Sequence, residues 1–129
     1  MNLEQLESTA KAMVAPGRGI LAADESTPTI GKRFDQINAE STEENRLIYR
    51  DMFFTTEGME DYISGVIMFD ETLRQSTVDR DVPFPKHLSG LGVIPGIKVD
   101  KGAKELAGFE GEKVTEGLDG LREIGRAHV

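Results

Sequence analysis

The sequence has no cysteine, few basic residues and no apolar stretch long enough to cross a bilayer. Without cysteine there are no disulfides and no thiolate metal sites, which is compatible with the cytoplasm. The two histidines, His87 and His128, have no ligand spacing around them, so we expect no metal site. Fifteen basic residues stand against 23 acidic ones, and the net charge of −8 argues against a nucleic-acid partner, because phosphate binding needs a basic patch.

The composition that remains is typical of a globular protein. The chain has 129 residues, of which 38% are hydrophobic and 29% charged, enough for one domain with a core. Residues 1–7 are acidic and amphipathic, unlike a signal or transit peptide. We therefore expect a cytoplasmic protein with no membrane partner. An anionic ligand would have to be held by a few well-placed cations.

The stretch from Gly19 to Asp24 organises the chain. Its apolar run predicts a buried strand of a parallel sheet, and Thr27 and Pro28 then suit the cap and first position of a helix over 28–37. Asp24 stands where the strand ends, and in α/β folds ligands bind at that end. Asp24 is therefore a candidate catalytic residue. The alternative is that it only caps the helix.

Further strands and helices are predicted along the chain by periodicity and by breakers. The strands are at 62–69 and 93–99, the second with an awkward Pro95, and the helices are at 2–14 and, behind a Ser41–Glu44 capping box, at 41–55. Less regular segments follow: a helical turn near 70–75, irregular chain over 72–91, loop or short extended chain over 100–116, and a turn into a helix over 115–122.

This order predicts an α/β fold with parallel strands joined by right-handed crossovers. Three strands that are apolar on both faces do not complete a sheet, so the chain reads as the beginning of a larger α/β fold.

Several polar groups are expected at the carboxyl ends of the strands. Lys98 ends the third strand, and parallel strands would bring it to the same rim as Asp24. Three hydroxyls at the start of the helix predicted over 28–37 suit a phosphate; they belong to Ser26, Thr27 and Thr29. Arg33 lies one helical turn further on and could bind the same anion. The alternative for residues 98–101 is a solvated charged loop.

These residues resemble the class I fructose-bisphosphate aldolase family over residues 1–123. The likeness is carried by separate blocks in family order: Ala15-Pro16-Gly17-Arg18-Gly19-Ile20-Leu21-Ala22-Ala23-Asp24-Glu25-Ser26, Thr42-Glu43-Glu44-Asn45-Arg46, Gly65-Val66-Ile67-Met68-Phe69 with Glu71-Thr72-Leu73, Pro83-Phe84-Pro85, Gly96-Ile97-Lys98-Val99-Asp100-Lys101-Gly102 and Gly117-Leu118-Asp119-Gly120-Leu121.

The resemblance implies a (β/α)8 TIM barrel that reversibly cleaves fructose 1,6-bisphosphate into dihydroxyacetone phosphate and glyceraldehyde 3-phosphate. It implies a lysine Schiff base, no metal or other cofactor, and a homo-oligomeric full-length form. By position, Asp24 matches a catalytic aspartate that assists proton transfers, and Lys98 matches an active-site lysine that contacts a substrate phosphate. Ser26, Thr29 and Arg33 match substrate and phosphate contacts.

The sequence departs from the family in two ways. Thr29 is often serine and Pro28 often glycine in animal members, which suggests a stiffer loop. The family's Schiff-base lysine is on the sixth strand and its other lysine and glutamate acid/base groups on the fourth and fifth, whereas this chain resembles the first three strand–helix units of the barrel. We therefore expect the chain alone to be inactive.

Two alternatives stay open. The short chain can be a non-enzymatic module that binds a sugar phosphate or pairs with an aldolase chain. Residues 124–129 do not continue the family pattern; they resemble the translation of a short-read sequencing adapter, and the alternative is a natural helix end.

Overall fold

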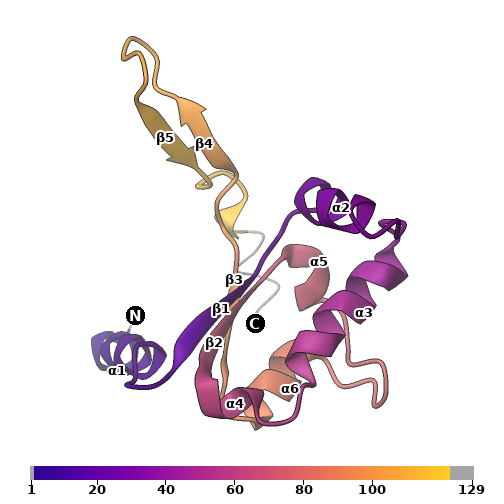
Figure 1. The fold of residues 1–129 in the computed structure, drawn as a ribbon. Coiled ribbons are helices and arrows are strands. Elements are labelled where there is room, and N and C mark those ends of the chain that lie inside the picture. Colours follow the sequence, from indigo (N-terminus) through magenta and orange to yellow (C-terminus); the bar gives the residue numbers. More distant parts are fainter. Residues whose placement is uncertain (1, 123–129) are drawn as a thin grey trace. The chain divides into compact units, whose positions relative to one another are not determined.

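The structure, a computed structural model, describes residues 2–122, so the tail at 124–129 lies outside the described residues. The chain forms two compact units, Met1–Ile97 and Lys98–Val129, which are described separately. The first contains α1 (Leu3–Met13), β1 (Gly19–Ala23), α2 (Thr27–Asp35), α3 (Glu43–Phe54), α4 (Met59–Tyr62), β2 (Ile63–Met68), α5 (Asp70–Leu73), α6 (Phe84–Gly90) and β3 (Ile94–Ile97) (Figure 1).

The three strands of the first unit form a parallel sheet in the order β1-β2-β3, as predicted. Ala23 pairs with Met68, which pairs with Ile97, so the three strands end at the same level. Pro95 is tolerated because β3 is at the edge of this sheet, where one side of the strand needs no donor. Gly96 suits the close packing of β3 against β2, since a Cβ atom there would lie only 3.0 Å from the carbonyl oxygen of Val66.

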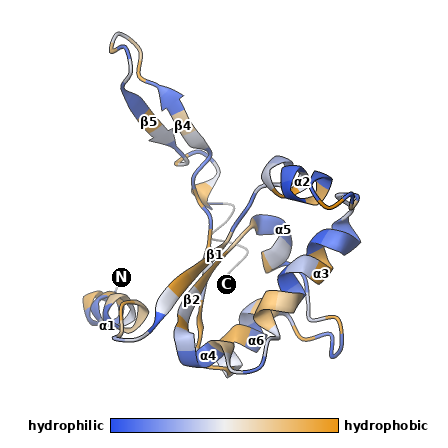
Figure 2. Cartoon of the chain, in the orientation of Figure 1, coloured by the Kyte–Doolittle hydropathy of each residue, from blue (hydrophilic) through white to orange (hydrophobic). Residues whose placement is uncertain are grey.

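The prediction that β1 is buried on both faces is wrong for the described chain. Leu21 and Ala23 face the core, but Ile20 is 43% exposed and Ala22 is exposed too. The reason is that the core cluster lies on the face of the sheet that carries Leu21 and Ala23, and the face of β1 that carries Ile20 and Ala22 is not covered in the described chain. The strand therefore alternates, although its sequence is continuously apolar; Figure 2 shows this apolar character along β1.

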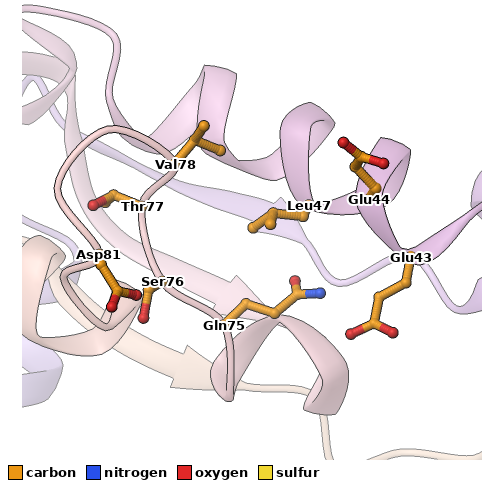
Figure 3. Close-up of a pocket in the computed structure, with 8 residues that line it drawn as sticks. All are labelled: Glu43, Glu44, Leu47, Gln75, Ser76, Thr77, Val78 and Asp81. Carbon is orange, nitrogen blue, oxygen red and sulfur yellow. The ribbon is translucent and has the colours of Figure 1, made fainter.

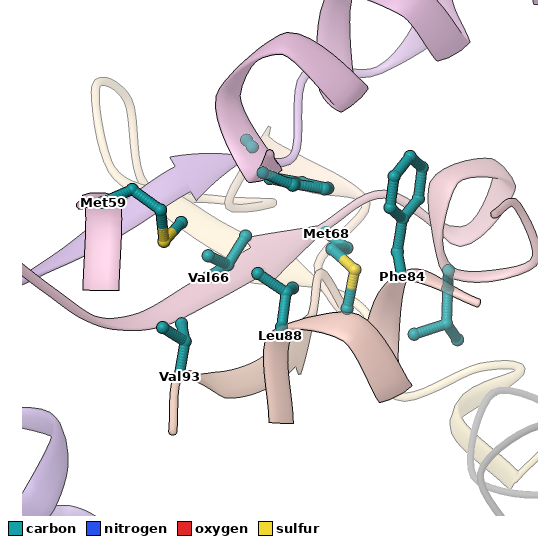
Figure 4. Packing of buried hydrophobic residues seen from close by; sticks show 9 residues of the cluster. Met59, Val66, Met68, Phe84, Leu88 and Val93 are labelled. Carbon is teal, nitrogen blue, oxygen red and sulfur yellow. The ribbon is translucent and has the colours of Figure 1, made fainter. Parts of the chain in front are cut away.

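The core lies where α3, α4, α5 and α6 cover one face of the sheet. Val66 and Met68 of β2 pack there with Phe84 and Leu88 of α6, and all four are at most 1% exposed (Figure 4). The ring of Phe84 meets that of Phe54 edge-on, with centroids 5.0 Å apart. This cluster attaches α3 and α6 to the sheet and so fixes the loops that follow its strands.

Two short helices were not predicted from the sequence. α6 lies inside the segment predicted to be irregular, and α4 follows Gly58, which adopts a φ of 79°. Pro83 and Pro85 were taken as breakers of regular structure, but they cap and open α6, because proline is well tolerated in the first turn of a helix.

Two predicted helix starts are off by one residue. Thr42, not Ser41, caps α3: its hydroxyl accepts a hydrogen bond of 3.1 Å from the backbone N–H of Asn45. Ser26, not Thr27, is the N-cap of α2. α2 also ends earlier than predicted, so that Ile37 lies beyond it and is 70% exposed.

The second unit contains an antiparallel hairpin, β4 (Gly102–Glu105) and β5 (Lys113–Glu116), in the segment predicted to be loop or short extended chain. A turn at residues 119–120 then leads into helical backbone at 121 and 122, as the sequence suggested. None of the described residues 98–122 is buried.

Candidate active site

Asp24 follows β1 directly and is half-buried. The residue before it, Ala23, is 4% exposed and belongs to the core cluster. Because the three strands are parallel and in level register, Asp24 lies at the carboxyl end of the sheet, the rim to which the sequence assigned it. Its chemical role stays a prediction.

Ser26 and Thr29 lie together at the start of α2. Their hydroxyl oxygens are 3.0 Å apart. The backbone N–H groups of Thr29 and Ile30 both donate to the carbonyl of Ser26, and Pro28 has no N–H. An anion at this helix start would therefore be bound by the two hydroxyls more than by backbone amides of the first turn.

Arg33 is anchored at the same loop. Its Nη1 donates to Glu25 Oε1 and, over 3.0 Å, to the hydroxyl of Tyr49. The hydrogen bond to Tyr49 and the negative charge of Glu25 raise the pKa of Arg33 above its ordinary value. The Arg33 side chain is 54% exposed, so a charged guanidinium with a fixed partner faces solvent beside the start of α2.

A second arginine, Arg50 of α3, binds the backbone of the loop between β1 and α2. It is 2% exposed and donates through Nε to the carbonyl of Ala23 and through Nη2 to the carbonyl of Glu25, both at 2.9 Å. Its Nη2 also lies 3.1 Å from Glu25 Oε2 in an ion pair. Burial lowers the pKa of Arg50, and the carboxylate of Glu25 opposes that effect.

A third arginine connects α3 to α5. Arg46 binds the carboxylate of Glu71 through two parallel hydrogen bonds of 2.8 and 2.7 Å, and it also donates to the carbonyl of Ser41. The hydrogen bonds from Arg46 hold the pKa of Glu71 below its ordinary value. This fork geometry is the strong form of a carboxylate–arginine contact.

Sequence reasoning missed Glu25, Arg46 and Arg50 as parts of this site. One signal was available: Arg46 and Arg50 precede Phe54 at intervals of four residues, which places both arginines on the helical stripe that faces the core. A charged residue on such a stripe needs a partner of opposite charge, which is Glu71 for Arg46 and Glu25 for Arg50.

Lys98 opens the second unit. Its Nζ lies 2.5 Å from Asp100 Oδ2, and the lysine side chain is only 24% exposed. Asp100 Oδ1 in turn accepts from the N–H of Gly102 at the start of β4. The hydrogen bond from Lys98 is the main cause that lowers the pKa of Asp100. Residues 98–101 are thus not a fully solvated loop. That Lys98 and Asp24 lie at the same rim of the sheet stays a prediction.

A separate groove of about 650 Å³ lies between α3 and the segment 75–81 (Figure 3). It is lined by three carboxylates, from Glu43, Glu44 and Asp81, together with Leu47, Gln75, Ser76, Thr77 and Val78. The predicted site residues do not line this groove. Within residues 2–122 no three His, Asp or Glu side chains cluster in a way that would hold a metal ion, and no helix there is long and apolar enough to span a membrane.

Comparison with known proteins identifies the family. Residues 5–128 match the family model described as fructose-bisphosphate aldolase class-I. A "probable fructose-bisphosphate aldolase class 1" of Xanthomonas campestris is 63% identical over 122 residues, which are 95% of this chain and 36% of that protein. The cytoplasmic isozyme of fructose-bisphosphate aldolase from Spinacia oleracea is 55% identical over 92% of this chain and 33% of its own length.

The fold agrees with this family. The crystal structure of Plasmodium falciparum fructose-bisphosphate aldolase, in complex with TRAP and a small-molecule inhibitor, superposes with a TM-score of 0.86 at 50% identity. The match covers 96% of this chain and 37% of that one. The prediction of strand–helix units from a TIM barrel whose sheet is not closed is thereby confirmed. The chain, which spans about a third of the length of these relatives, belongs to the class I fructose-bisphosphate aldolase family.

Proposed function

We propose that this chain contributes to an enzyme that reversibly cleaves fructose 1,6-bisphosphate into dihydroxyacetone phosphate and glyceraldehyde 3-phosphate. The observation that carries the proposal is the 63% identity to the Xanthomonas campestris protein over 95% of the chain. The reaction proceeds through a lysine Schiff base, whose protonated imine accepts the electron pair released when the carbon–carbon bond breaks. It needs no metal or other cofactor.

In this proposal the residues at the carboxyl ends of the strands divide the work. Asp24 transfers protons during the Schiff-base steps. Ser26, Thr29 and Arg33 bind a substrate phosphate, which is supported by the 3.0 Å approach of the two hydroxyls and by the exposed, charged guanidinium beside them. Lys98 adds a further cation for a phosphate.

The imine-forming lysine is proposed to lie outside these 129 residues. Within the described chain, Lys98 is the one lysine that directly follows a parallel strand, and its ammonium is already paired with Asp100. A nucleophilic lysine needs a lowered pKa, and a neighbouring carboxylate favours the protonated form instead.

We further propose that the protein acts in the cytoplasm as a homo-oligomer, with a small sugar phosphate as its ligand and without nucleic acid or membrane. The cytosolic isozymes among the relatives support the cytoplasmic assignment, and the net charge of −8 supports the absence of a nucleic-acid partner.

A chimera tests the function directly. The aligned 122 residues of this chain replace their counterparts in the Xanthomonas campestris relative, and cleavage of fructose 1,6-bisphosphate is measured against the parent protein. We expect a turnover on the order of that of the parent. In this chimera Asp24→Ala should lower kcat by at least about 100-fold, the usual contribution of a general acid or base. Lys98→Ala should mainly raise KM. An active parent with an inactive chimera would refute the proposal.

The isolated chain provides the opposite test. We expect no cleavage, no heat of binding on titration with fructose 1,6-bisphosphate, and no adduct on Lys98 after borohydride treatment with dihydroxyacetone phosphate. Micromolar binding without cleavage would instead favour a non-enzymatic module that binds sugar phosphates.

A further inference from the structure

The Arg50 side chain makes an unusual set of contacts around Asp24. Its Nε donates to the carbonyl of Ala23 and its Nη2 to the carbonyl of Glu25, each over 2.9 Å. One rigid guanidinium therefore holds the peptide group directly before Asp24 and the peptide group that follows Glu25, so the two held groups lie on either side of the Asp24–Glu25 segment. The donor comes from the middle of α3, 27 and 25 residues further along the chain than the two acceptors.

The burial of Arg50 needs an explanation, since removing a charge from water is costly. The side chain is 2% exposed, and Glu25, its ion-pair partner, is 9% exposed. An apolar residue of similar volume would fill the same space without this penalty. The feature that an apolar residue lacks is the pair of directed donors to the carbonyls of Ala23 and Glu25, the residues before and after Asp24.

Backbone direction sets where a short side chain can place its carboxylate. The peptide group between Ala23 and Asp24 is held directly, and the next one, between Asp24 and Glu25, has to join two held peptide groups. The φ and ψ angles of Asp24, and with them the direction of its Cα–Cβ bond, are therefore restricted. Aspartate has only one methylene beyond that bond, so a shifted backbone moves its oxygens by a similar distance. Proton transfer requires donor and acceptor within about 2.6–3.2 Å, and a displacement of about 1 Å in an active site lowers a rate by on the order of 100-fold.

We infer that Arg50 is a positioning residue for Asp24. Its guanidinium donates hydrogen bonds to the carbonyls of Ala23 and Glu25 and so orients the Asp24 carboxylate toward the substrate. The inference rests on the proposed function, in which Asp24 transfers protons. Glu25 completes the assembly, because its carboxylate is paired with Arg50 on the buried side and with Arg33 on the exposed side.

Kinetics of the aldolase chimera test this inference. Arg50→Ala should lower kcat by about 100-fold while KM for fructose 1,6-bisphosphate changes little, because Arg50 does not contact substrate. Arg50→Lys keeps the charge but offers one donor point in place of a fork, so we expect it to lose most of the same activity. If Arg50→Ala does not fold, Arg50→Lys carries the test. A lysine variant with the kcat of the unsubstituted chimera would overturn the inference.

A double-mutant cycle distinguishes positioning from general stabilisation. If Arg50 acts through Asp24, the double variant Asp24→Ala/Arg50→Lys should be no slower than Asp24→Ala alone. Leu88→Ala in α6 is the matched control: it should lower the midpoint of urea unfolding at least as much as Arg50→Lys does, with an unchanged kcat. If Leu88→Ala loses as much kcat, or if the losses from Asp24 and Arg50 simply multiply, the role of Arg50 is structural only.

The same experiments separate this inference from the proposed function. An inactive unsubstituted chimera, or an Asp24→Ala variant with normal kcat, would contradict the function itself. An active chimera that requires Asp24 but tolerates Arg50→Lys would contradict only the positioning role.

Discussion

The two units of the chain are stabilised in different ways. In residues 2–97 helices cover one face of a parallel sheet, with side chains such as Phe54, Phe84 and Leu88 fully removed from water. In residues 98–122 no described residue is buried. The hairpin forms because the backbones of β4 and β5 pair, and the side chains of both strands remain accessible to water. Asp24 lies in the first unit and Lys98 in the second, but among the described residues only the first unit contains a cluster of buried side chains.

This difference shows where the described chain can hold a charge rigidly. Arg50 and Glu25 are fixed because the core and two backbone carbonyls surround them. The pair Lys113–Glu105 spans 3.5 Å on the hairpin, with both side chains more than half exposed. An exposed pair of this kind contributes little to stability because water screens it and both side chains lose freedom. The predictions below, made for the chimera, test this contrast.

Truncation in the core should have the largest effect. Phe84→Ala should lower the free energy of unfolding by about 3–5 kcal/mol, because it removes a buried ring and leaves a cavity beside Phe54. Val114→Ala on the hairpin, where the valine is 47% exposed, is the matched change in the second unit and should stay within about 0.5 kcal/mol. Urea unfolding followed by circular dichroism measures both. Equal losses would show that the hairpin is buried in the assembled protein.

Breaking the half-buried ion pair should have the next largest effect. Glu71→Gln removes the carboxylate that accepts two hydrogen bonds from Arg46 and leaves that guanidinium without its charge partner. We expect a loss of about 1.5–3 kcal/mol in the free energy of unfolding, the range for hydrogen bonds to charged groups. Glu105→Gln removes the exposed partner of Lys113 and should leave stability unchanged within error. A measurable loss at Glu105 would contradict the contrast between the units.

The contribution of the Arg46–Glu71 pair to stability should decrease at acidic pH. The hydrogen bonds from Arg46 lower the pKa of Glu71 in the folded state. The stabilisation is therefore fully present above the ordinary glutamate pKa of about 4.3 and is lost as the pH falls below it, towards the lower pKa of the folded state. Unfolding midpoints measured from pH 6 downward should fall less steeply in Glu71→Gln than in the unsubstituted protein. Parallel curves would mean that Glu71 does not contribute to acid sensitivity.

Removal of a helix cap should have the smallest effect. Thr42→Ala removes the hydroxyl that accepts from the N–H of Asn45 at the start of α3 and should cost about 1 kcal/mol. Thr42→Ser retains the hydroxyl and should restore most of that stability, whereas Ser41→Ala, at the residue first predicted as the cap, should not show a capping loss. If Ser41→Ala is the more destabilising of the two alanine variants, the assignment of the cap is wrong.

The sequence by itself determined the three strands of the parallel sheet, the three longest helices and the order in which they come. Apolar runs at 19–24, 62–69 and 93–99 predicted three parallel strands, and helical periodicity predicted α1, α2 and α3. It also placed Asp24 and Lys98 at the ends of strands, and in the structure each directly follows its strand. These features depend on residues close together in the chain, and side-chain periodicity reports them directly.

Only the tertiary structure decided which distant residues meet. That β1 has one open face in the described chain depends on which elements pack against the sheet, and periodicity within a strand does not contain this information. That Arg50 grips the carbonyls beside Asp24 depends on how α3 docks against the sheet, more than 20 residues away along the chain. The physical reason is the same in both cases: burial and hydrogen-bond partners are properties of the packed arrangement, because any one stretch of sequence is compatible with several neighbours.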